Sequence, residues 1–567
     1  MVFDLDRVIR GLLSHPQGLL QEMAIGIVIF IAAFLPRLIS LGTMITSDEP
    51  TWFNRSHNFV NALTALDLAH TFQHVHPGVT LMWISGLASW LSETSAGLTG
   101  FAPLSFDQQL FFMLLPVAMA TSLGVVAVFF LARELFGVKI AALAAAIIAF
   151  DPFLVGHSRV LQLDALLATF MLISALAMLV YLKKDDYRYL IFACVTAGLA
   201  VLTKSPGLFL IPFLFLSLAA WRYFDQVSRR RMTFRAYLRG LAKPALIILV
   251  TIATTFVVVW PAMWVEPVQT LDKYINGIEW AVETPHERGG FFMGDYLDGQ
   301  YPLSYYPVVF LMRSTPFALI FLPIAAAFVI ARAVSRRFSA REMSVALLLV
   351  YVVAFSVEMT LGDKKFDRYL LPVFPAADVL GAVGIGYCAE AIVARLWGRS
   401  GQVSGEKSRH RADATYAAAL ALVTIVSLAI LVPLQPYFLS YYNPVIPGNP
   451  SNAPNVLLIG WGDGLDAAAR YLNEKPGADK MKVAVNYNGF TAFFHGQTVT
   501  LPRKENNLTG LEGCDYVVFY VSAIQRTWNL GLMQQFHSVP PEKIIRLNGI
   551  DHCWIYKVEK SGEAAGS

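Results

Sequence analysis

Long apolar runs alternate with short polar segments along most of this chain. A helix needs about 20 mostly apolar residues to cross the hydrocarbon core of a bilayer. Eleven runs come close to that length or exceed it, and each predicts a spanning helix. They cover residues 23–42, 110–132, 139–157, 163–182, 188–203, 206–221, 244–264, 307–331, 343–361, 369–394 and 414–433. The pattern predicts an α-helical polytopic membrane protein.

A further apolar run, residues 77–91, is short and contains Pro77 and two glycines. As a twelfth span it would invert everything after it, and the basic segment 222–243 would then face outward. Because lysine and arginine favour cytoplasmic loops, we expect this run to lie flat in the interface or to re-enter the membrane. Its two tryptophans, Trp83 and Trp90, suit an interfacial position.

The distribution of lysine and arginine also orients the other spans. Most of these residues fall in segments that lie on one side if the N-terminus is cytoplasmic. The other side then holds the outer loop 43–109, with its interfacial helices, and the outer loop 265–306. We therefore expect a multi-pass protein of the bacterial inner or plasma membrane, with residues 1–434 as its transmembrane domain.

The last part of the chain, residues 435–567, becomes polar, and we expect it to form an extracytoplasmic domain. The segment NVLLIGWGDGLDAAARYLNE predicts a strand, a glycine turn and a helix, and KVAVNYN, DYVVFYV and CWIYKV predict strands. A small α/β domain follows. GWGDG (460–464) favours a tight turn over a dinucleotide site, because it is incomplete as G-x-G-x-x-G. A disulfide between Cys514 and Cys553 is possible, but the sequence alone does not decide whether it forms.

Composition narrows the class of protein. Apolar residues make up 56% of the 567 residues and charged residues 15%, and the mean hydropathy is +0.53. A soluble chain could not bury that much apolar surface. Disorder and coiled coils are therefore disfavoured, and the net charge of +4 is too small to imply nucleic acid.

The candidate chemistry lies at the outer ends of the predicted helices, where acids, histidines and isolated cations collect. Cations at membrane level can hold a phosphate whose lipid tail stays in the bilayer, and a carboxylate can take a proton from a nucleophile. Sugar transfer from a polyprenyl phosphate needs both. The candidates are Asp48, Glu49, His74, His76, Arg159, Asp164, Lys204, Glu283, His286, Arg288, Lys364, Lys365, Arg368 and Tyr369.

Several of these residues also have a plainer interpretation. Asp164 could cap the N-terminus of its helix, and Lys204 could extend to the interface. A divalent metal ion is a candidate cofactor, although no ligand spacing is diagnostic. Its candidate ligands are His74, His76, Glu283 and His286.

Five motifs occur in order along the membrane part and resemble the large membrane glycosyltransferases that use lipid-phosphate sugars. This group, of the GT-C type, includes the protein O-mannosyltransferases and the aminoarabinose transferase of lipid A. The motifs are DE (48–49), HPGVTLMW (76–83), SRVLQLDALL (158–167), GLAVLTKSPGLFLIP (198–212) and KKFDRYLLPVFPA (364–376). The C-terminal domain also resembles the outer domain of bacterial members.

The resemblance implies a role for each matching position. Asp48 would be the general base or would orient the acceptor, with Glu49 supporting it and Asp164 as the second acid. Lys204 would bind the donor phosphate, and Arg368 and Tyr369 would line the donor cavity. His76 stands where the mannosyltransferases have a histidine, which favours a mannose-like sugar.

The expected function is thus an inverting glycosyltransferase that moves a sugar from a polyprenyl-phosphate donor to a glycan, lipid or protein acceptor outside the cytoplasm. The binding set further includes Arg159, His286, Arg288 and Lys365. The alternative is a secondary transporter or flippase for a lipid-linked or small anionic substrate, but no internal repeat supports it. A receptor would leave the charges at positions 48, 164 and 204 unexplained.

Overall fold

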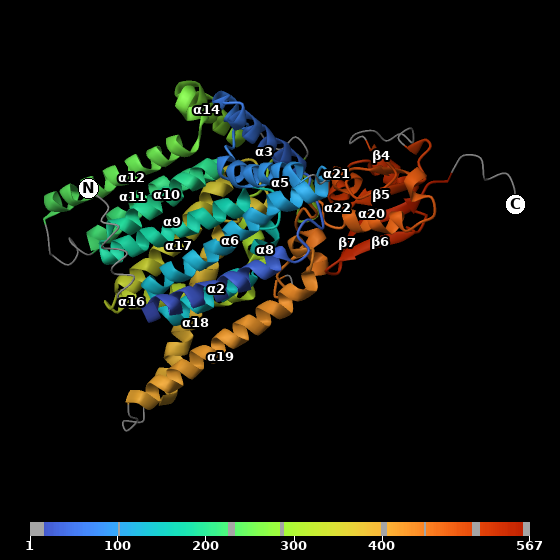
Figure 1. The fold of residues 1–567 in the computed structure, drawn as a ribbon. Coiled ribbons are helices and arrows are strands. Elements are labelled where there is room, and N and C mark those ends of the chain that lie inside the picture. The colour runs from blue at the N-terminus through green and yellow to red at the C-terminus, as the bar shows by residue number, and fades with distance from the viewer. Residues whose placement is uncertain are drawn as a thin grey trace, which may run out of the picture.

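The computed structural model describes residues 16–99, 102–224, 233–283, 289–397, 405–446, 449–501 and 511–559. A helical bundle carries a small sheet domain at one end (Figure 1). The main helices are α2 (Pro16–Leu38), α6 (Phe106–Phe136), α7 (Val138–Phe150), α9 (Asp164–Lys184), α10 (Tyr187–Thr203), α11 (Leu210–Arg222), α12 (Phe234–Val259), α16 (Pro316–Val334), α17 (Ala340–Leu361), α18 (Val373–Trp397) and α19 (Gly405–Leu431).

Within the described ranges, nine helices are long and apolar enough to cross a membrane. Each coincides with a predicted span. The other two predicted spans are α7 and α10, which are apolar helices of 13 and 17 residues. The predicted class, a polytopic helical membrane protein with a small C-terminal sheet region, is confirmed.

Two predicted spans are interrupted by local capping. The run 139–157 breaks at Asp151, whose carboxylate accepts hydrogen bonds from the backbone of the short helix α8 (Pro152–His157). The run 307–331 breaks before α16, where the Thr315 hydroxyl accepts a hydrogen bond from the backbone N–H of Ala318. In both places a proline stands at the first helical position, where it needs no hydrogen-bond donor.

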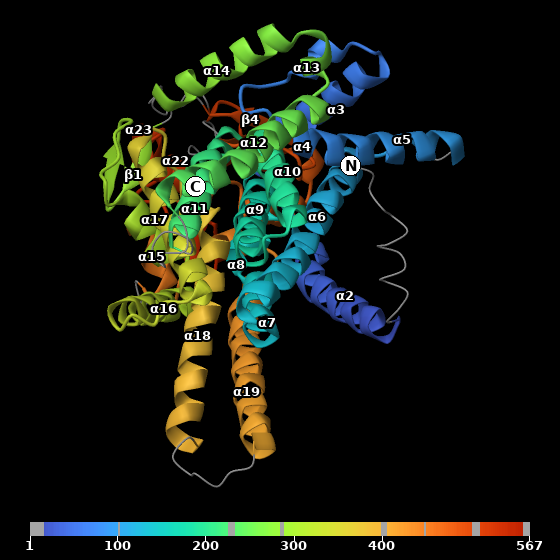
Figure 2. The ribbon, with the colours of Figure 1, turned by 90° about the vertical axis from the view of Figure 1, so that its left-hand side faces the viewer.

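Short helices lie across the bundle near the sheet domain. They are α3 (Glu49–Thr64), η1 (Leu68–Thr71), α4 (Val79–Leu81), the π-helix η2 (Met82–Gly86), α5 (Leu87–Thr99), η3 (Ser205–Phe209), α13 (Ala262–Val265), α14 (Pro267–Glu283), α15 (Tyr305–Arg313) and η5 (Asp367–Leu370). Figure 2 shows α5 and α14 running crosswise to the bundle. The ambiguous run 77–91 falls in this layer, and Trp83 Nε1 donates to the Val259 carbonyl at 2.8 Å. The hairpin of β1 (Gly290–Phe292) and β2 (Asp295–Leu297) follows α14.

The C-terminal domain contains a five-stranded sheet in the order β4-β3-β5-β7-β6. β3 pairs in parallel with β4 and β5, while β7 pairs antiparallel with β5 and β6. Its elements are α20 (Leu465–Asn473), β3 (Lys482–Val485), α21 (Asn488–Thr491), β4 (Gln497–Thr500), β5 (Tyr516–Tyr520), α22 (Val521–Gln525), α23 (Leu530–Gln535), β6 (Lys543–Leu547) and β7 (Ile550–Lys557). β3, β5 and β7 correspond to the predicted strands, whereas the sequence patterns did not identify β4 and β6.

One strand prediction in this domain was wrong. The segment NVLLIG forms no strand and makes only an isolated bridge between Leu457 and Phe292. The Gln525 side chain takes the place of a neighbouring strand, because its oxygen accepts from Ile459 N at 2.8 Å and its nitrogen donates to Leu457 O at 2.9 Å. Cys514 and Cys553 are both buried thiols, not a disulfide.

Candidate active site

Asp48 and Glu49 lie at the start of α3, directly after the loop that leaves α2. The Glu49 side chain points into the protein. Its two oxygens accept hydrogen bonds from Thr46 N at 2.6 Å and from Leu161 N at 2.9 Å. Burial raises the pKa of Glu49 to about 7, although these N–H groups favour its ionised form. Glu49 therefore ties the first loop to the segment before α9 and leaves Asp48 facing outward.

A buried ion pair joins the next two helices at the same end. Lys204, which ends α10, donates from Nζ to Asp164 Oδ1 at 2.6 Å. The two side chains are only 9% and 2% exposed. Asp164 is the first residue of α9, but its carboxylate makes no capping hydrogen bond. It pairs with Lys204 instead of capping its own helix.

Arg368 connects this pair to Asp48. Its Nη2 donates to Asp48 Oδ2 at 3.3 Å, and its Nε lies 3.8 Å from Asp164 Oδ2. Gln162 also donates to Asp48 Oδ2, at 3.2 Å. Although burial disfavours the charged form of Arg368, the neighbouring acids, Asp48 first, raise its pKa above the ordinary value. Two carboxylates and two cations from four segments of the chain thus form one connected cluster.

This cluster opens into a cavity of about 230 Å³, here called the bundle cavity. Lys204 Nζ lies 4.2 Å from the centre of the Tyr369 ring, an attractive cation–π distance. The lining residues are Asp48, Thr51, Trp52, Arg55, His74, His76, Gln162, Leu163, Lys204, Arg368 and Tyr369. Six of the residues singled out from the sequence therefore share one cavity.

Sequence reasoning missed Trp52, Arg55 and Gln162. Arg55 lies on α3 two turns after Asp48, so the helical period places both on the same face. Its guanidinium lies 4.6 Å from the centre of the Trp52 ring. Gln162 belongs to the motif around Asp164, and only the fold shows that it contacts Asp48.

His74 and His76 line the bundle cavity as neutral side chains. Burial, followed by nearby cations, lowers the pKa of His74 to about 4 and that of His76 well below its ordinary value. His76 Nδ1 forms a hydrogen bond with the Ser205 hydroxyl at 3.0 Å, and His76 N donates to His74 Nδ1 at 3.1 Å. Within the described parts of the chain, no three His, Cys, Asp or Glu side chains are grouped so as to hold a metal ion.

Other predicted site residues lie outside this cavity. Arg159 donates to the carbonyls of Pro36, Ile39 and Ser40 and so caps the end of α2. The Lys365 ammonium is 3.4 Å from the Tyr301 carbonyl. His286 and Arg288 fall outside the described residues, as does the side chain of Glu283.

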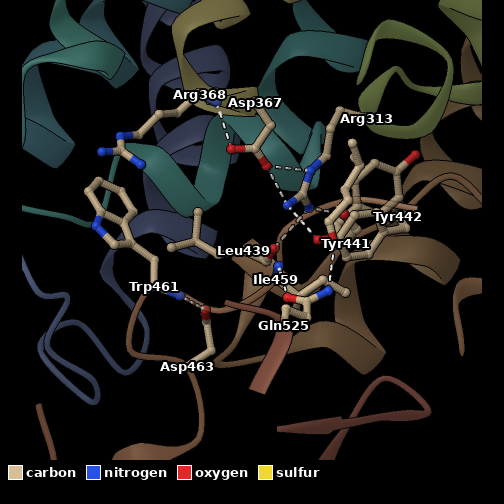
Figure 3. Close-up of polar contacts among 11 residues, drawn as sticks. Arg313, Asp367, Arg368, Leu439, Tyr441, Tyr442, Ile459, Trp461, Asp463 and Gln525 are labelled. Atoms are coloured by element: carbon tan, nitrogen blue, oxygen red, sulfur yellow. Dashed lines mark hydrogen bonds and ion pairs between the residues drawn. The ribbon is translucent and has the colours of Figure 1, made fainter. Parts of the chain in front are cut away.

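A second cavity, of about 90 Å³, lies between the bundle and the C-terminal domain and is here called the junction cavity. Its lining residues are Ser47, Asp48, Phe153, His157, Arg313, Phe366, Asp367, Arg368, Leu439, Leu458, Gly460, Trp461, Asp463, Tyr487 and Arg526. The two cavities share Asp48 and Arg368. Figure 3 shows the part of its wall around Arg313, Asp367 and Trp461.

Arg313 organises this wall. It donates to Asp367 Oδ2 from Nε at 2.9 Å and from Nη2 at 2.6 Å, and it also donates to Leu439 O at 2.9 Å. Burial alone would raise the pKa of Asp367, but the positive charges, Arg313 first, hold it below its ordinary value. From the C-terminal domain, the Trp461 ring centre lies 4.3 Å from the Arg368 guanidinium, which also contacts Phe366. No pattern in the sequence indicated that GWGDG reaches the end of the bundle that carries Asp48 and Arg368.

Part of the chain is similar to a known protein family. Residues 88–261 match the profile of a family described as dolichyl-phosphate-mannose-protein mannosyltransferase. The match includes Asp164 and Lys204. Residues 88–261 are therefore similar to a glycosyltransferase family, and the resemblance predicted from the motifs is confirmed.

Two solved structures are similar to this chain over most of its length. ArnT from Cupriavidus metallidurans, bound to undecaprenyl phosphate, shares 14% identity over 95% of this chain and 99% of its own, with a TM-score of 0.46. The oligosaccharyltransferase AglB from Archaeoglobus fulgidus, in complex with an inhibitory peptide and a dolichol-phosphate, shares 13% over 90% of this chain and 71% of its own, with a TM-score of 0.48. A search of curated proteins finds no match.

Proposed function

We propose that this protein is an inverting glycosyltransferase that moves a mannose-like sugar from a polyprenyl-phosphate donor to an extracytoplasmic acceptor. The observation that carries the proposal is the bundle cavity, where Lys204, Arg368 and Arg55 face the same space as Asp48. The family match of residues 88–261 supports it independently.

Lys204 and Arg368 are placed to bind the donor phosphate. Both are buried or nearly so, and a buried cation binds an anion more strongly than an exposed one, because little water screens the interaction. The departing phosphate gains negative charge in the transition state, and these cations would stabilise it. Asp164 holds the Lys204 ammonium in position until the donor arrives.

Asp48 is the proposed general base. Gln162 and Arg368 hold one carboxylate oxygen, Oδ2, which fixes the orientation of the group. Asp48 can then take the proton of an acceptor hydroxyl as that oxygen attacks the anomeric carbon. A single displacement inverts the anomeric centre and needs no covalent enzyme intermediate.

An apolar groove fits the lipid part of the donor. It has a volume of about 630 Å³ on α15, α16 and α17 and is lined almost entirely by apolar side chains, including Tyr306, Phe310 and Leu361. The loop that carries Arg368 and Tyr369 begins directly after Leu361. A polyprenyl chain in this groove would therefore leave its phosphate close to the bundle cavity.

The same proposal includes sidedness. Residues 1–434 form the transmembrane glycosyltransferase domain with a cytoplasmic N-terminus, and residues 435–567 form the extracytoplasmic domain of a bacterial inner-membrane protein. The asymmetric distribution of lysine and arginine supports this orientation.

Purified full-length protein incubated with radiolabelled polyprenyl-phosphate mannose should consume the donor. Asp48→Asn keeps the size of the side chain but removes the base, and general-base catalysis contributes ~10²–10⁴-fold, so turnover should fall by about that factor. Asp67→Asn is the matched control, because Asp67 is exposed and pairs with His70 away from both cavities. Full turnover by Asp48→Asn would exclude Asp48 as the base, and no consumption of lipid-phosphate sugars by wild type would exclude the function.

A further inference from the structure

The junction cavity has no role in the scheme above, although it shares Asp48 and Arg368 with the bundle cavity. A transfer reaction needs two substrates that approach the reacting carbon from opposite sides, because single displacement requires a line between nucleophile and leaving group. The donor occupies the bundle cavity in the proposed function. The junction cavity lies where the second substrate could reach the same carboxylate.

The C-terminal domain builds one wall of this cavity, and it is fixed against the bundle by backbone contacts. Ser47 N donates to the Trp461 carbonyl at 3.1 Å. A Cβ atom at Gly462 would lie 2.2 Å from the carbonyl oxygen of Ile45, and the φ angle of this residue is +137°. Only glycine allows so close an approach in this conformation. The loop 460–464 is therefore shaped to pack against the segment that carries Asp48.

The charges on the wall balance in number. Arg313 pairs with Asp367, and Arg368 pairs with Asp48. The third cation and the third carboxylate, Arg526 and Asp463, come from the C-terminal domain. A wall of balanced charge favours an uncharged polar group over a phosphate or an ammonium ion.

Arg526 and Asp463 are the two charged residues that the C-terminal domain contributes to this wall. Arg526 donates from Nη1 to the Tyr487 hydroxyl at 3.0 Å and from Nε to Gly289 O at 3.3 Å. Asp463 Oδ2 accepts from Trp461 N at 3.2 Å. Asp463 is 3% exposed, and its Oδ1 has no hydrogen-bond partner in the part of the chain that the structure describes. A buried carboxylate oxygen without a donor is unfavourable, so Asp463 would be stabilised by turning toward a hydroxyl in the cavity that it lines.

We propose that the junction cavity is the acceptor site and that it binds an uncharged, hydroxyl-bearing acceptor through Asp463 and Arg526. The inference rests on the proposed function. The acceptor hydroxyl gives its proton to Asp48, and its oxygen forms the bond to the anomeric carbon. The bond from that carbon to the phosphate oxygen breaks, and its electron pair leaves with the polyprenyl phosphate.

The test measures steady-state transfer from polyprenyl-phosphate mannose by the full-length protein in detergent. Methyl α-mannopyranoside and a serine-containing peptide serve as acceptors in separate experiments. The acceptor that receives the sugar shows whether the hydroxyl belongs to a glycan or to a peptide. Asp463→Asn and Arg526→Gln should each raise the KM for that acceptor by ~10-fold, as expected when one hydrogen bond to a charged group is lost. The KM for the donor should change less than twofold.

Asp551→Asn is the matched control, because this carboxylate pairs with Arg546 on the surface and should retain wild-type constants. Leu458→Phe adds bulk to the cavity without changing charge and should also raise the acceptor KM. Leu458→Phe therefore still tests the acceptor site if Asp463→Asn destabilises the protein and lowers its thermal midpoint. A phosphorylated glycoside should be the poorer acceptor for the wild-type protein, in which the charges of the wall are balanced.

An unchanged acceptor KM in these variants or a parallel rise in the donor KM would overturn the inference. A preference of the wild-type protein for the phosphorylated glycoside would overturn it as well. Donor hydrolysis by wild type without transfer to either hydroxyl probe would also overturn it, while leaving the proposed function intact. Failure to consume any lipid-phosphate sugar would instead overturn the proposed function itself.

Discussion

The two ends of the helical bundle carry the same kinds of ion pairs in opposite environments. At the end away from the sheet domain, Lys184 and Glu134 lie 2.5 Å apart with side chains 37% and 26% exposed. At the other end, Lys204 and Asp164 lie 2.6 Å apart and are almost fully buried. Exposed pairs contribute ~0–1 kcal/mol, whereas breaking a buried pair costs ~3–5 kcal/mol. Burying a charged pair is costly, so the burial of Lys204 and Asp164 indicates a functional role more strongly than the number of charged residues does.

The largest expected contrast concerns catalysis by Lys204. Lys204→Ala removes the cation proposed to bind the donor phosphate and leaves Asp164 buried without its lysine partner. We expect kcat/KM for polyprenyl-phosphate mannose to fall ~100-fold or more, as when one transition-state donor is removed. Lys184→Ala, the matched change at the opposite end, should alter kcat/KM less than twofold. Equal effects in the two variants would show that burial is irrelevant to this function.

The next contrast concerns stability at the junction. Arg313→Gln leaves Asp367 and two backbone carbonyls without their donor in a buried site. We expect a loss of ~3–5 kcal/mol in unfolding free energy, seen as a clear drop in the thermal midpoint in detergent. Arg341→Gln breaks the partly exposed pair with Glu390 and should lower stability by about 1 kcal/mol at most. A similar midpoint for both variants would contradict the comparison.

A pH series gives a third contrast, centred on Glu49. Its pKa is raised to about 7 in the fold, above an unfolded value of ~4.3, so the folded state binds the extra proton. That stabilisation is complete below the unfolded pKa and is lost as pH rises through about 7. The thermal midpoint of wild type should therefore decline between pH 5 and 8, and Glu49→Gln should flatten the decline.

The exposed Glu390 supplies the control for that series. Glu390→Gln should keep the pH slope of wild type, because the change lies at the opposite end of the bundle, in an exposed pair with Arg341. If the thermal midpoint of Glu49→Gln still declines with pH as in wild type, the pH dependence arises from another group.

The smallest expected effect concerns how the C-terminal domain positions Arg368. Trp461→Ala removes an aromatic ring from the guanidinium, an interaction of ~0.5–2 kcal/mol, and kcat should fall by ~2–30-fold. Trp461→Phe keeps a ring in this place and should recover most of the loss. A structural role alone would lower the thermal midpoint of Trp461→Ala without this recovery in kcat.

The sequence predicted the helices well because their signal is local. Apolar runs of membrane-spanning length identify a span wherever its neighbours lie, and all eleven predicted runs are helical. Local capping was harder to see, as at Asp151 and Thr315, because one side chain ends a helix inside an apolar run. The false strand at 456–460 failed for a related reason, since a single glutamine, Gln525, satisfies the backbone there.

The candidate site likewise has features that follow from local sequence and features that follow only from the fold. The sequence alone determined that acids and cations stand at the ends of apolar helices, because only the order of residues along the chain is needed to place them there. Only the tertiary structure decided which of them meet. Arg368 reaches Asp48 across 320 residues, and the Trp461 ring contacts its guanidinium. Such pairings depend on how helices and loops pack in three dimensions, and no local periodicity records them.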